Sequence, residues 1–350
     1  MVSNTGLIFK KVPVASPVIG AHFSIETREF DLAAEPPEGC FIVKNIYLSF
    51  DPYQRGCMRE PDAATWAPPF MPGHPLICGA VSTVLKSTVP GFQSGDLVWG
   101  MFGAEEYFLV PPFLIPMARK LDNPLGLDPI LYTGALGTSG LSAYASLYEF
   151  GKPEKGQTIY ISAASGGVGQ IVGQLAKMEG LTVIGSVGSD EKLDFIVGEL
   201  GFDAAFNYKK ESVADALQRL APGGLDIYYD NVGGETLDAA LAAMKDFGRI
   251  IGCGMISQYN LPQEEKYGLK NMMNLFLKRL TLQGFIISDP EFVGKYAVDF
   301  FTKMSVWLKD GKIKTKESVT VGIENAAMCY LGMFTGDNFG KTVLKIADLK

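Results

Sequence analysis

One stretch indicates the fold of this chain: Thr158-Ile159-Tyr160-Ile161-Ser162-Ala163-Ala164-Ser165-Gly166-Gly167-Val168-Gly169. It opens with a short apolar run rich in isoleucine, which is typical of a buried strand. A glycine-rich turn follows the run. From Gly169 to Met178, apolar residues then recur at the spacing of a helix face. The stretch therefore predicts a strand, a tight turn and a helix in direct succession.

Such a turn aims free backbone N–H groups and the positive end of a helix at a pyrophosphate. We interpret Gly166 as the position where the backbone approaches the phosphates, and Gly169 as the position where helix and strand pack closely. Ala164 stands where the usual pattern has its first glycine, and a lone match of this kind is weak. Because a strand precedes the turn and a helix follows it, we predict a dinucleotide site. The alternative is a glycine-rich turn in another type of α/β protein.

The end of the next strand, predicted at 182–185, bears on the choice of nucleotide. An NAD site usually carries an acidic residue about 20 residues beyond the glycines, where it holds the ribose hydroxyls. Here no acid occurs before Asp190, and Lys192, Lys209 and Lys210 follow. Cations and hydroxyls without a carboxylate suit a 2′-phosphate, so we predict NADPH. The alternative is that these lysines are ordinary solvated side chains.

Further strands and helices alternate along the chain, which implies right-handed crossovers and a parallel sheet. We predict strands at 226–230 and 249–252 and a helix at 190–200, and a long amphipathic stretch at 290–308 closes this region. The chain before about Tyr132 has short apolar runs broken by Pro and Gly, such as 40–48 and 80–85, and these predict a compact all-β unit. The tail returns to short strand-like runs. The predicted class is thus α/β: a doubly wound Rossmann domain (137–310) inserted into a substrate domain (1–136 and 311–350).

Composition excludes several classes of protein. The 350 residues suffice for two domains, and the net charge of −7 does not favour a nucleic acid or anionic membrane partner. We see no secretory signal and no apolar stretch long enough to span a bilayer. Five scattered cysteines predict reduced, buried thiols. We expect a cytoplasmic location.

Metal and hydrolase chemistry lack their usual residues. No two cysteines have the close spacing of a zinc site, and His22 and His74 are the two histidines of the chain. We predict no metal. A hydrolase with a Ser-His-Asp or Cys-His site is disfavoured because the chain has two histidines.

Sequence motifs in order along nearly the whole chain carry a family likeness. The segments that carry it are 47–55, 163–169, 173–177, 188–192, 206–209, 229–235, 248–250, 253–260 and 336–341. By these segments the chain resembles the prostaglandin reductase (leukotriene B4 12-hydroxydehydrogenase) and plant alkenal double-bond reductase branch of the medium-chain dehydrogenases/reductases. Two segments depart from the family pattern and leave the substrate open: Thr138-Ser139, where the family often has Met-Pro, and the loop from Arg59 to Pro72.

The resemblance implies a GroES-like β-barrel for the substrate domain, NADP(H) as cofactor and a set of contact residues. The nucleotide is expected against Gly166, Gly167, Val168, Gly169, Ser189, Lys192, Tyr208 and Asn231. The nicotinamide end is expected against Cys253, Gly254, Met255, Ile256, Ser257, Tyr259, Phe285, Ile286, Ile287 and Asn338. Tyr53 and Tyr259 match substrate-pocket tyrosines and are the expected catalytic residues. Alternatively, Tyr53 is a packing aromatic, and Asn231 and Asn338 belong to turns.

The reaction implied is hydride transfer from NADPH to the β-carbon of an α,β-unsaturated aldehyde or ketone, with Tyr259 or the cofactor's ribose hydroxyl stabilising the enolate. The α-proton could come from a tyrosine or from water. One alternative is a quinone or ketone reductase on the same scaffold. Another is a non-catalytic NADPH-binding protein, since the fold alone does not fix function. We expect a homodimer that acts on a small-molecule substrate.

Overall fold

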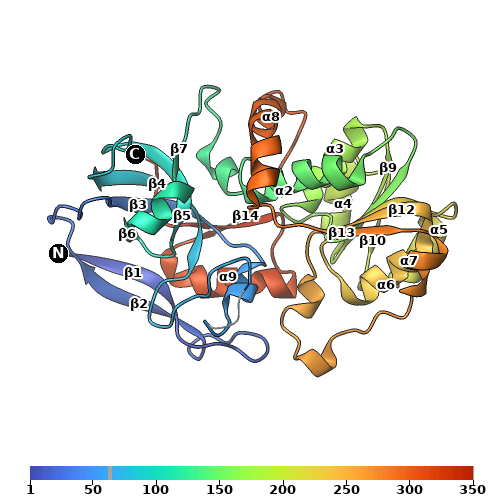
Figure 1. The fold of residues 1–350 in the computed structure, drawn as a ribbon, viewed down its shortest axis with the longest axis horizontal. Helices are drawn as coiled ribbons and strands as arrows, with labels where there is room; N and C mark the ends of the chain where they lie inside the picture. The colour runs from blue at the N-terminus through green and yellow to red at the C-terminus, as the bar shows by residue number, and fades with distance from the viewer. Residues whose placement is uncertain (62–64, 350) are drawn as a thin grey trace. The chain divides into compact units, whose positions relative to one another are not determined.

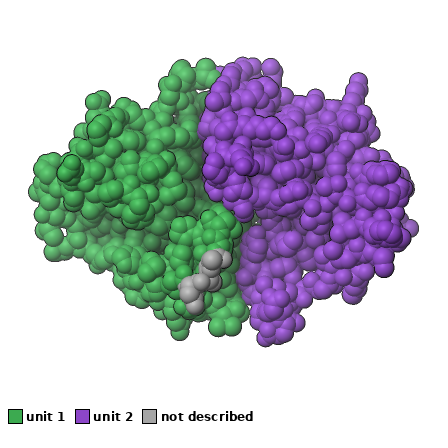
Figure 2. Space-filling model, in the orientation of Figure 1, with its two compact units in different colours: residues 1–134, 317–338, 342–350 green, residues 135–316, 339–341 purple. Residues whose placement is uncertain are grey.

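The computed structural model describes residues 1–61 and 65–349. It divides into two compact units (Figures 1 and 2). Unit 1 comprises residues 1–134, 317–338 and 342–350, and unit 2 comprises residues 135–316 and 339–341. Part of the unusual loop 59–72, namely residues 62–64, lies outside the described residues. Among the described residues, no helix has both the length and the apolar character needed to cross a bilayer.

Unit 2 is built on a six-stranded sheet with the order β10-β9-β8-β11-β12-β13. All its neighbouring strands run parallel. Its strands are β8 (Thr158–Ile161), β9 (Thr182–Val187), β10 (Ala204–Asn207), β11 (Leu225–Asp230), β12 (Met244–Gly252) and β13 (Thr281–Gly284). Its helices are α2 (Thr138–Ser146), α3 (Gly169–Met178), α4 (Asp190–Gly198), α5 (Val213–Leu220), α6 (Gly234–Ala243), α7 (Met273–Leu277) and α8 (Pro290–Lys309). A short π-helix, η3 (Leu147–Gly151), follows α2.

The predicted parallel sheet and its strand–helix alternation are confirmed in unit 2. Helix α3 spans the predicted residues, and the amphipathic stretch 290–308 forms helix α8, which extends one residue further, to Lys309. The predicted helix 190–200 ends earlier, at Gly198. Strand β12 begins at Met244, five residues before the predicted start at 249. The prediction missed the first half of this strand because that half is irregular, with Phe247 at φ 61°. Stacked rings of Tyr160 and Tyr228, with centroids 5.0 Å apart, lie in the core.

Unit 1 is formed by antiparallel sheets, which confirms the second, separate domain of the predicted fold class. A seven-stranded sheet has the order β14-β15-β3-β4-β5-β7, with β6 paired to β3, and β1 and β2 form a sheet of two strands. The strands are β1 (Val2–Phe9), β2 (Phe23–Phe30), β3 (Phe41–Ser49), β4 (Ile77–Ser87), β5 (Leu97–Gly103), β6 (Tyr107–Val110), β7 (Arg119–Lys120), β14 (Glu317–Val321) and β15 (Lys341–Lys345). Helices α1 (Gln54–Cys57) and α9 (Ala326–Thr335) complete the unit together with short 3-10 turns, among them η1 (Pro112–Met117).

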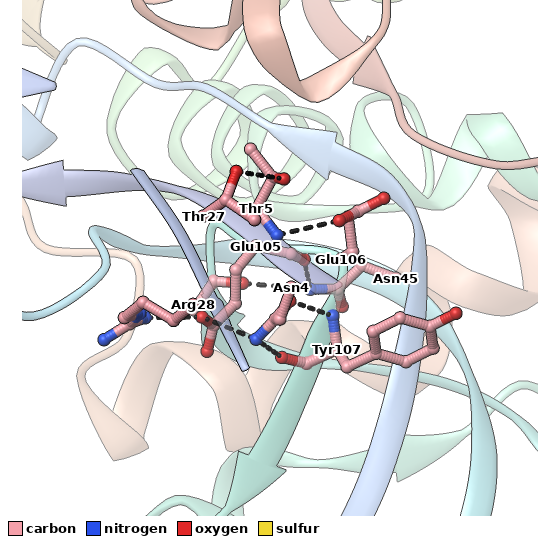
Figure 3. Close-up of polar contacts among 9 residues, drawn as sticks. Asn4, Thr5, Thr27, Arg28, Asn45, Glu105, Glu106 and Tyr107 are labelled. Carbon is pink, nitrogen blue, oxygen red and sulfur yellow. Dashed lines mark hydrogen bonds and ion pairs between the residues drawn. The ribbon is translucent and has the colours of Figure 1, made fainter. Parts of the chain in front are cut away.

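A buried polar cluster ties the two sheets of unit 1 together (Figure 3). The Asn4 side chain donates to the Glu105 carboxylate (3.0 Å) and to the Tyr107 carbonyl (2.9 Å). Arg28, on β2, donates to the same Glu105 oxygen (2.6 Å). Asn45, on β3, donates to the carbonyls of Gly103 and Glu105. Because each buried polar group finds a partner, this cluster fixes the β1–β2 hairpin on the larger sheet.

Candidate active site

The predicted cofactor residues of unit 2 follow the carboxyl ends of its parallel strands, the usual ligand-binding edge of such a sheet. The glycine turn follows β8, Ser189 and Lys192 follow β9, and Tyr208 follows β10. Asn231 follows β11, the segment 253–259 follows β12, and 285–287 follows β13. Tyr53 and Asn338 belong to unit 1. Unit 2 therefore brings all the other predicted site residues to one edge of its sheet.

The glycine turn is shaped for a close backbone approach. A Cβ at Gly169 would lie 2.5 Å from the Ala163 carbonyl oxygen and 2.8 Å from the Ala164 Cα, so glycine is required there. Ala163 itself adopts a left-handed conformation with φ 49°, and the Ala164 N–H donates to the Ser186 carbonyl on β9. No side chain caps the N-terminus of α3. The backbone N–H groups of Gln170 and Ile171 donate to the carbonyls of Gly166 and Val168 (3.1 and 3.0 Å). The amides of Gly167, Val168 and Gly169 are therefore the ones that this turn can offer to an anion such as a pyrophosphate, and the turn fits the predicted group.

The end of β9 gathers Ser189, Lys192 and Tyr208. Ser189 caps α4, and its hydroxyl accepts the backbone N–H of Lys192 (3.3 Å). The side chain of Lys192 is nearly buried, with 9% exposed. The Tyr208 hydroxyl lies against Gly188, since a Cβ there would be 2.8 Å from it. These three residues supply one nearly buried cation and two hydroxyls after the ends of neighbouring strands, a donor set that suits a phosphate group.

The first acid after β9 is already engaged. The Asp190 carboxylate accepts the Asn207 side-chain amide (3.0 Å) and pairs with the Lys210 ammonium. These contacts hold the pKa of Asp190 below its usual range. The Asp190 carboxylate is therefore already engaged and is not placed to accept the ribose hydroxyls. The charge of Lys210, one of the three lysines that follow this strand in the sequence, is paired with Asp190.

Sequence reasoning missed Asp230, the buried residue that shapes the turn after β11. Its side chain is 1% exposed, and its Oδ1 accepts the Tyr228 hydroxyl (2.7 Å) and the backbone N–H groups of Val232 (2.9 Å) and Gly233 (2.8 Å). Burial raises the pKa of Asp230 in spite of these donors. An acid at a strand end, directly before Asn-Val-Gly-Gly, was the available signal.

Asn231 is held by Ser162, the residue directly after β8. Its backbone N–H donates to the Ser162 hydroxyl (2.9 Å), and its side-chain amide donates to the Ser162 carbonyl (2.7 Å). These contacts tie the turn after β11 to the glycine turn, so Asn231 does more than close its own turn. One N–H of the Asn231 side-chain amide is used in this way, so the amide oxygen and the second N–H are what Asn231 can offer to a ligand.

The segment after β12 is bound to the turn after β11. Cys253 and Gly254 donate backbone N–H groups to the Asp230 carbonyl (2.9 and 3.0 Å), and Ile256 donates to the Asn231 carbonyl (3.2 Å). The Ser257 hydroxyl donates to the Val232 carbonyl (2.7 Å). Burial raises the pKa of the Cys253 thiol to about 12. The thiol therefore stays protonated near neutral pH.

The Tyr259 side chain folds back onto the segment 253–259. The backbone N–H of Met255 donates to the Tyr259 hydroxyl oxygen (3.0 Å). Burial raises the pKa of Tyr259 above its usual value, so the phenol keeps its proton near neutral pH. The Tyr259 oxygen is the acceptor in this hydrogen bond, so its O–H can still donate to a ligand.

The ring of Phe285 is occupied by packing. It stacks on Phe292 of α8 with centroids 5.6 Å apart and planes 11° apart, and it lies 6.0 Å from Phe150 on the π-helix. This ring is therefore used to hold the 285–287 segment in place. The segment 285–287 can therefore offer a ligand its backbone and the side chains of Ile286 and Ile287.

In unit 1, Tyr53 directly precedes helix α1. The Gln54 side chain accepts the Asp51 N–H (2.9 Å) and donates to the Ile77 carbonyl (3.2 Å), which fixes the backbone around Tyr53. Burial raises the pKa of Tyr53 well above its usual value. Its ring contacts Trp66, a neighbour that sequence reasoning missed. Asn338 lies in the loop between α9 and β15.

No group of three or more His, Cys, Asp or Glu side chains that could hold a metal ion occurs in residues 1–61 and 65–349. The described cysteines are free thiols, and Cys253 is the one that is only partly buried. The expectation of a metal-free protein remains a prediction.

Two family models match the chain: "Zinc-binding dehydrogenase" over residues 167–303 and "N-terminal domain of oxidoreductase" over residues 7–113. The NADP-dependent oxidoreductase RED1 of Cochliobolus heterostrophus is 47% identical, and the match covers 100% of this chain and 99% of the relative. A 2-alkenal reductase (NADP(+)-dependent) of Nicotiana tabacum is 43% identical, with 99% and 98% covered. A crystal structure of CurA in complex with NADPH from Vibrio vulnificus is 32% identical, with 99% and 100% covered and a TM-score of 0.87.

These likenesses extend over the whole length of the chain, and the antiparallel and parallel sheets are those of the family fold. The resemblance read from the sequence motifs is thereby confirmed. The chain belongs to the medium-chain dehydrogenase/reductase family of oxidoreductases, in the part of it that includes the NADP-dependent alkenal reductases.

Proposed function

We propose that this protein is an NADPH-dependent reductase that saturates the C=C bond of α,β-unsaturated aldehydes and ketones. The tobacco relative named a 2-alkenal reductase is similar over 99% of the chain, which supports this class of substrate. The protonated Tyr259 hydroxyl, held in place by the Met255 N–H, carries the chemical part of the proposal, because an O–H donor is what a developing enolate requires. We assign no metal to the reaction.

Unit 2 is the proposed nucleotide-binding domain, corresponding to the predicted 137–310. The uncapped start of α3 and the turn Gly166–Gly169 would hold the pyrophosphate. Ser189, Lys192 and Tyr208 would hold the 2′-phosphate, and Asn231 with the 253–259 and 285–287 segments would line the nicotinamide end. Asn338, in unit 1, is also proposed as a contact of that end. When bound, NADPH supplies the hydride that is transferred to the substrate.

The two tyrosines are proposed to act on the substrate. Both phenols are protonated near neutral pH because burial raises the pKa of each. Tyr259 would donate its O–H to the carbonyl oxygen, where charge gathers as the substrate becomes an enolate. Tyr53, in the proposed substrate domain (predicted as 1–136 and 311–350), would flank the flat conjugated system with its ring.

We also propose that the protein forms a homodimer through the edge of the parallel sheet. All four residues of the edge strand β13 are exposed, although parallel sheets are normally covered on both faces. The neighbouring helix α7 buries no side chain and exposes Met273 and Phe276. Pairing of two β13 strands about a two-fold axis would satisfy both edges at once. A mass measurement in solution should give a dimer, and Leu282→Arg should give a monomer.

Product analysis tests the proposed reaction. The protein is incubated with NADPH and, separately, with an enal, a quinone and a saturated ketone. We expect a saturated aldehyde from the enal and no turnover of the saturated ketone. An allylic alcohol as the main product, or a quinone as the preferred substrate, would refute the proposal. Tight NADPH binding without turnover of any of the three would support a non-catalytic role.

A further inference from the structure

Trp66 is an exposed tryptophan beside a residue of the proposed active site. Its ring centroid lies 5.4 Å from that of Tyr53, with the planes tilted by 55°. Despite this contact, Trp66 remains 51% exposed. A tryptophan buries a large apolar area when it is covered, so one that stays exposed next to a catalytic candidate offers a surface to a ligand.

The backbone next to Trp66 is anchored. The Arg59 guanidinium donates to the carbonyl of Ala67, the residue directly after Trp66, and to the carbonyl of Gly56. Pro68 and Pro69 follow, and their rings limit the backbone of that stretch. The Phe70 N–H then donates to the Cys57 carbonyl (2.8 Å), and the Phe70 ring is buried. The indole therefore lies on an anchored segment, so little conformational entropy would be lost when a ligand covers it.

We propose that Trp66, together with Tyr53, forms an aromatic wall that makes this enzyme prefer substrates with an aryl group conjugated to the enal or enone. This inference rests on the proposed function and names its substrate class. Two tilted rings give a flat aryl group an edge-to-face or offset contact, which a short alkyl chain cannot make. Tyr53 alone would offer one ring to either kind of substrate.

The test compares cinnamaldehyde with crotonaldehyde, which differ in the group on the β-carbon, at saturating NADPH. Trp66→Ala should raise KM for cinnamaldehyde about threefold to tenfold, the scale of one aromatic contact, with little change in kcat. The KM for crotonaldehyde should stay nearly the same. Trp66→Phe should restore most of the preference. Phe113→Ala is the matched control, since Phe113 is an exposed aromatic (75%) on η1 of the same unit.

Equal changes in KM for the two substrates in Trp66→Ala, or no change for either, would overturn the inference. A second measurement does not depend on turnover: quenching of tryptophan fluorescence by benzylacetone, a saturated aryl ketone, in the NADPH complex. Quenching should be strong in the wild type and largely lost in Trp66→Phe, and equal quenching in both would overturn the inference. If the wild type reduces neither enal, the proposed function has failed, and the fluorescence result alone decides the role of Trp66.

Discussion

Replacing Lys192 by Met should weaken NADPH binding about 10- to 150-fold and leave NADH binding nearly unchanged. A hydrogen bond to a charged group contributes roughly 1.5–3 kcal/mol, and each 1.4 kcal/mol is tenfold in Kd. The full range applies because the Lys192 side chain is 9% exposed and is little screened by solvent. Met keeps an unbranched apolar stem, so the loss reports the charge.

Helix α4 should keep its fold in Lys192→Met. The capping bond to Ser189 uses the backbone N–H of Lys192, which Met also has. Lys210→Met is the matched control, because Lys210 lies on the surface and pairs with Asp190. Dissociation constants for NADPH and NADH would be measured by calorimetry at one fixed salt concentration. Equal losses for the two nucleotides in Lys192→Met, or an equal loss of NADPH affinity in Lys210→Met, would refute the assignment of the 2′-phosphate.

Three further predictions concern catalysis, pH and metal. Tyr259→Phe should lower kcat for an enal by about 10²–10³ with a smaller change in KM, as for a lost oxyanion donor; a much smaller loss would assign the donor role to the ribose hydroxyl or water. Burial raises the pKa of Glu105 above its usual value of 4.5 in spite of Arg28. Glu105 therefore makes its full contribution to the unfolding free energy below pH 4.5, and this contribution is lost as the pH rises through the pKa of the folded state. Glu105→Gln should therefore show a smaller fall in Tm than the wild type as pH rises from about 4 to 8, and parallel profiles would contradict this. Elemental analysis should find no stoichiometric zinc, and a chelator should leave activity intact; activity that is lost with the chelator and restored by zinc would overturn the prediction.

The parts of the fold that depend on local pattern could be predicted from the sequence. The strand, turn and helix at 158–178 are continuous along the chain, so their apolar spacing and glycines were sufficient evidence. The first half of β12 could not be predicted in this way, because Phe247 interrupts its extended backbone with a positive φ.

The contacts within the candidate site were harder to foresee. The donors to Asp230 come from a core tyrosine and from the following turn, and their convergence depends on the folded path of the chain. The stacking of Phe285 on Phe292 depends on how α8 packs, which no local pattern specifies. Trp66 contacts Tyr53 across a loop whose sequence has no periodicity. The roles assigned to these residues and the domain boundaries stay predictions.

The position of β15 in its sheet has a consequence for synthesis of the chain. β15 lies between β14 and β3, and Val343 pairs with Ser49. At a typical rate of 5–20 residues per second, a ribosome would add Val343 about 15 to 60 s after Ser49. Strand β6 pairs with residues 41–44 of β3, so until β15 is made the edge of β3 is open at residues 47–49. An open edge is a template for aggregation, whereas residues 135–316 emerge as one uninterrupted segment. Loss of residues 341–350 should therefore shift the protein from the soluble fraction to aggregates, and the nascent first unit should depend on chaperones that hold an unpaired strand.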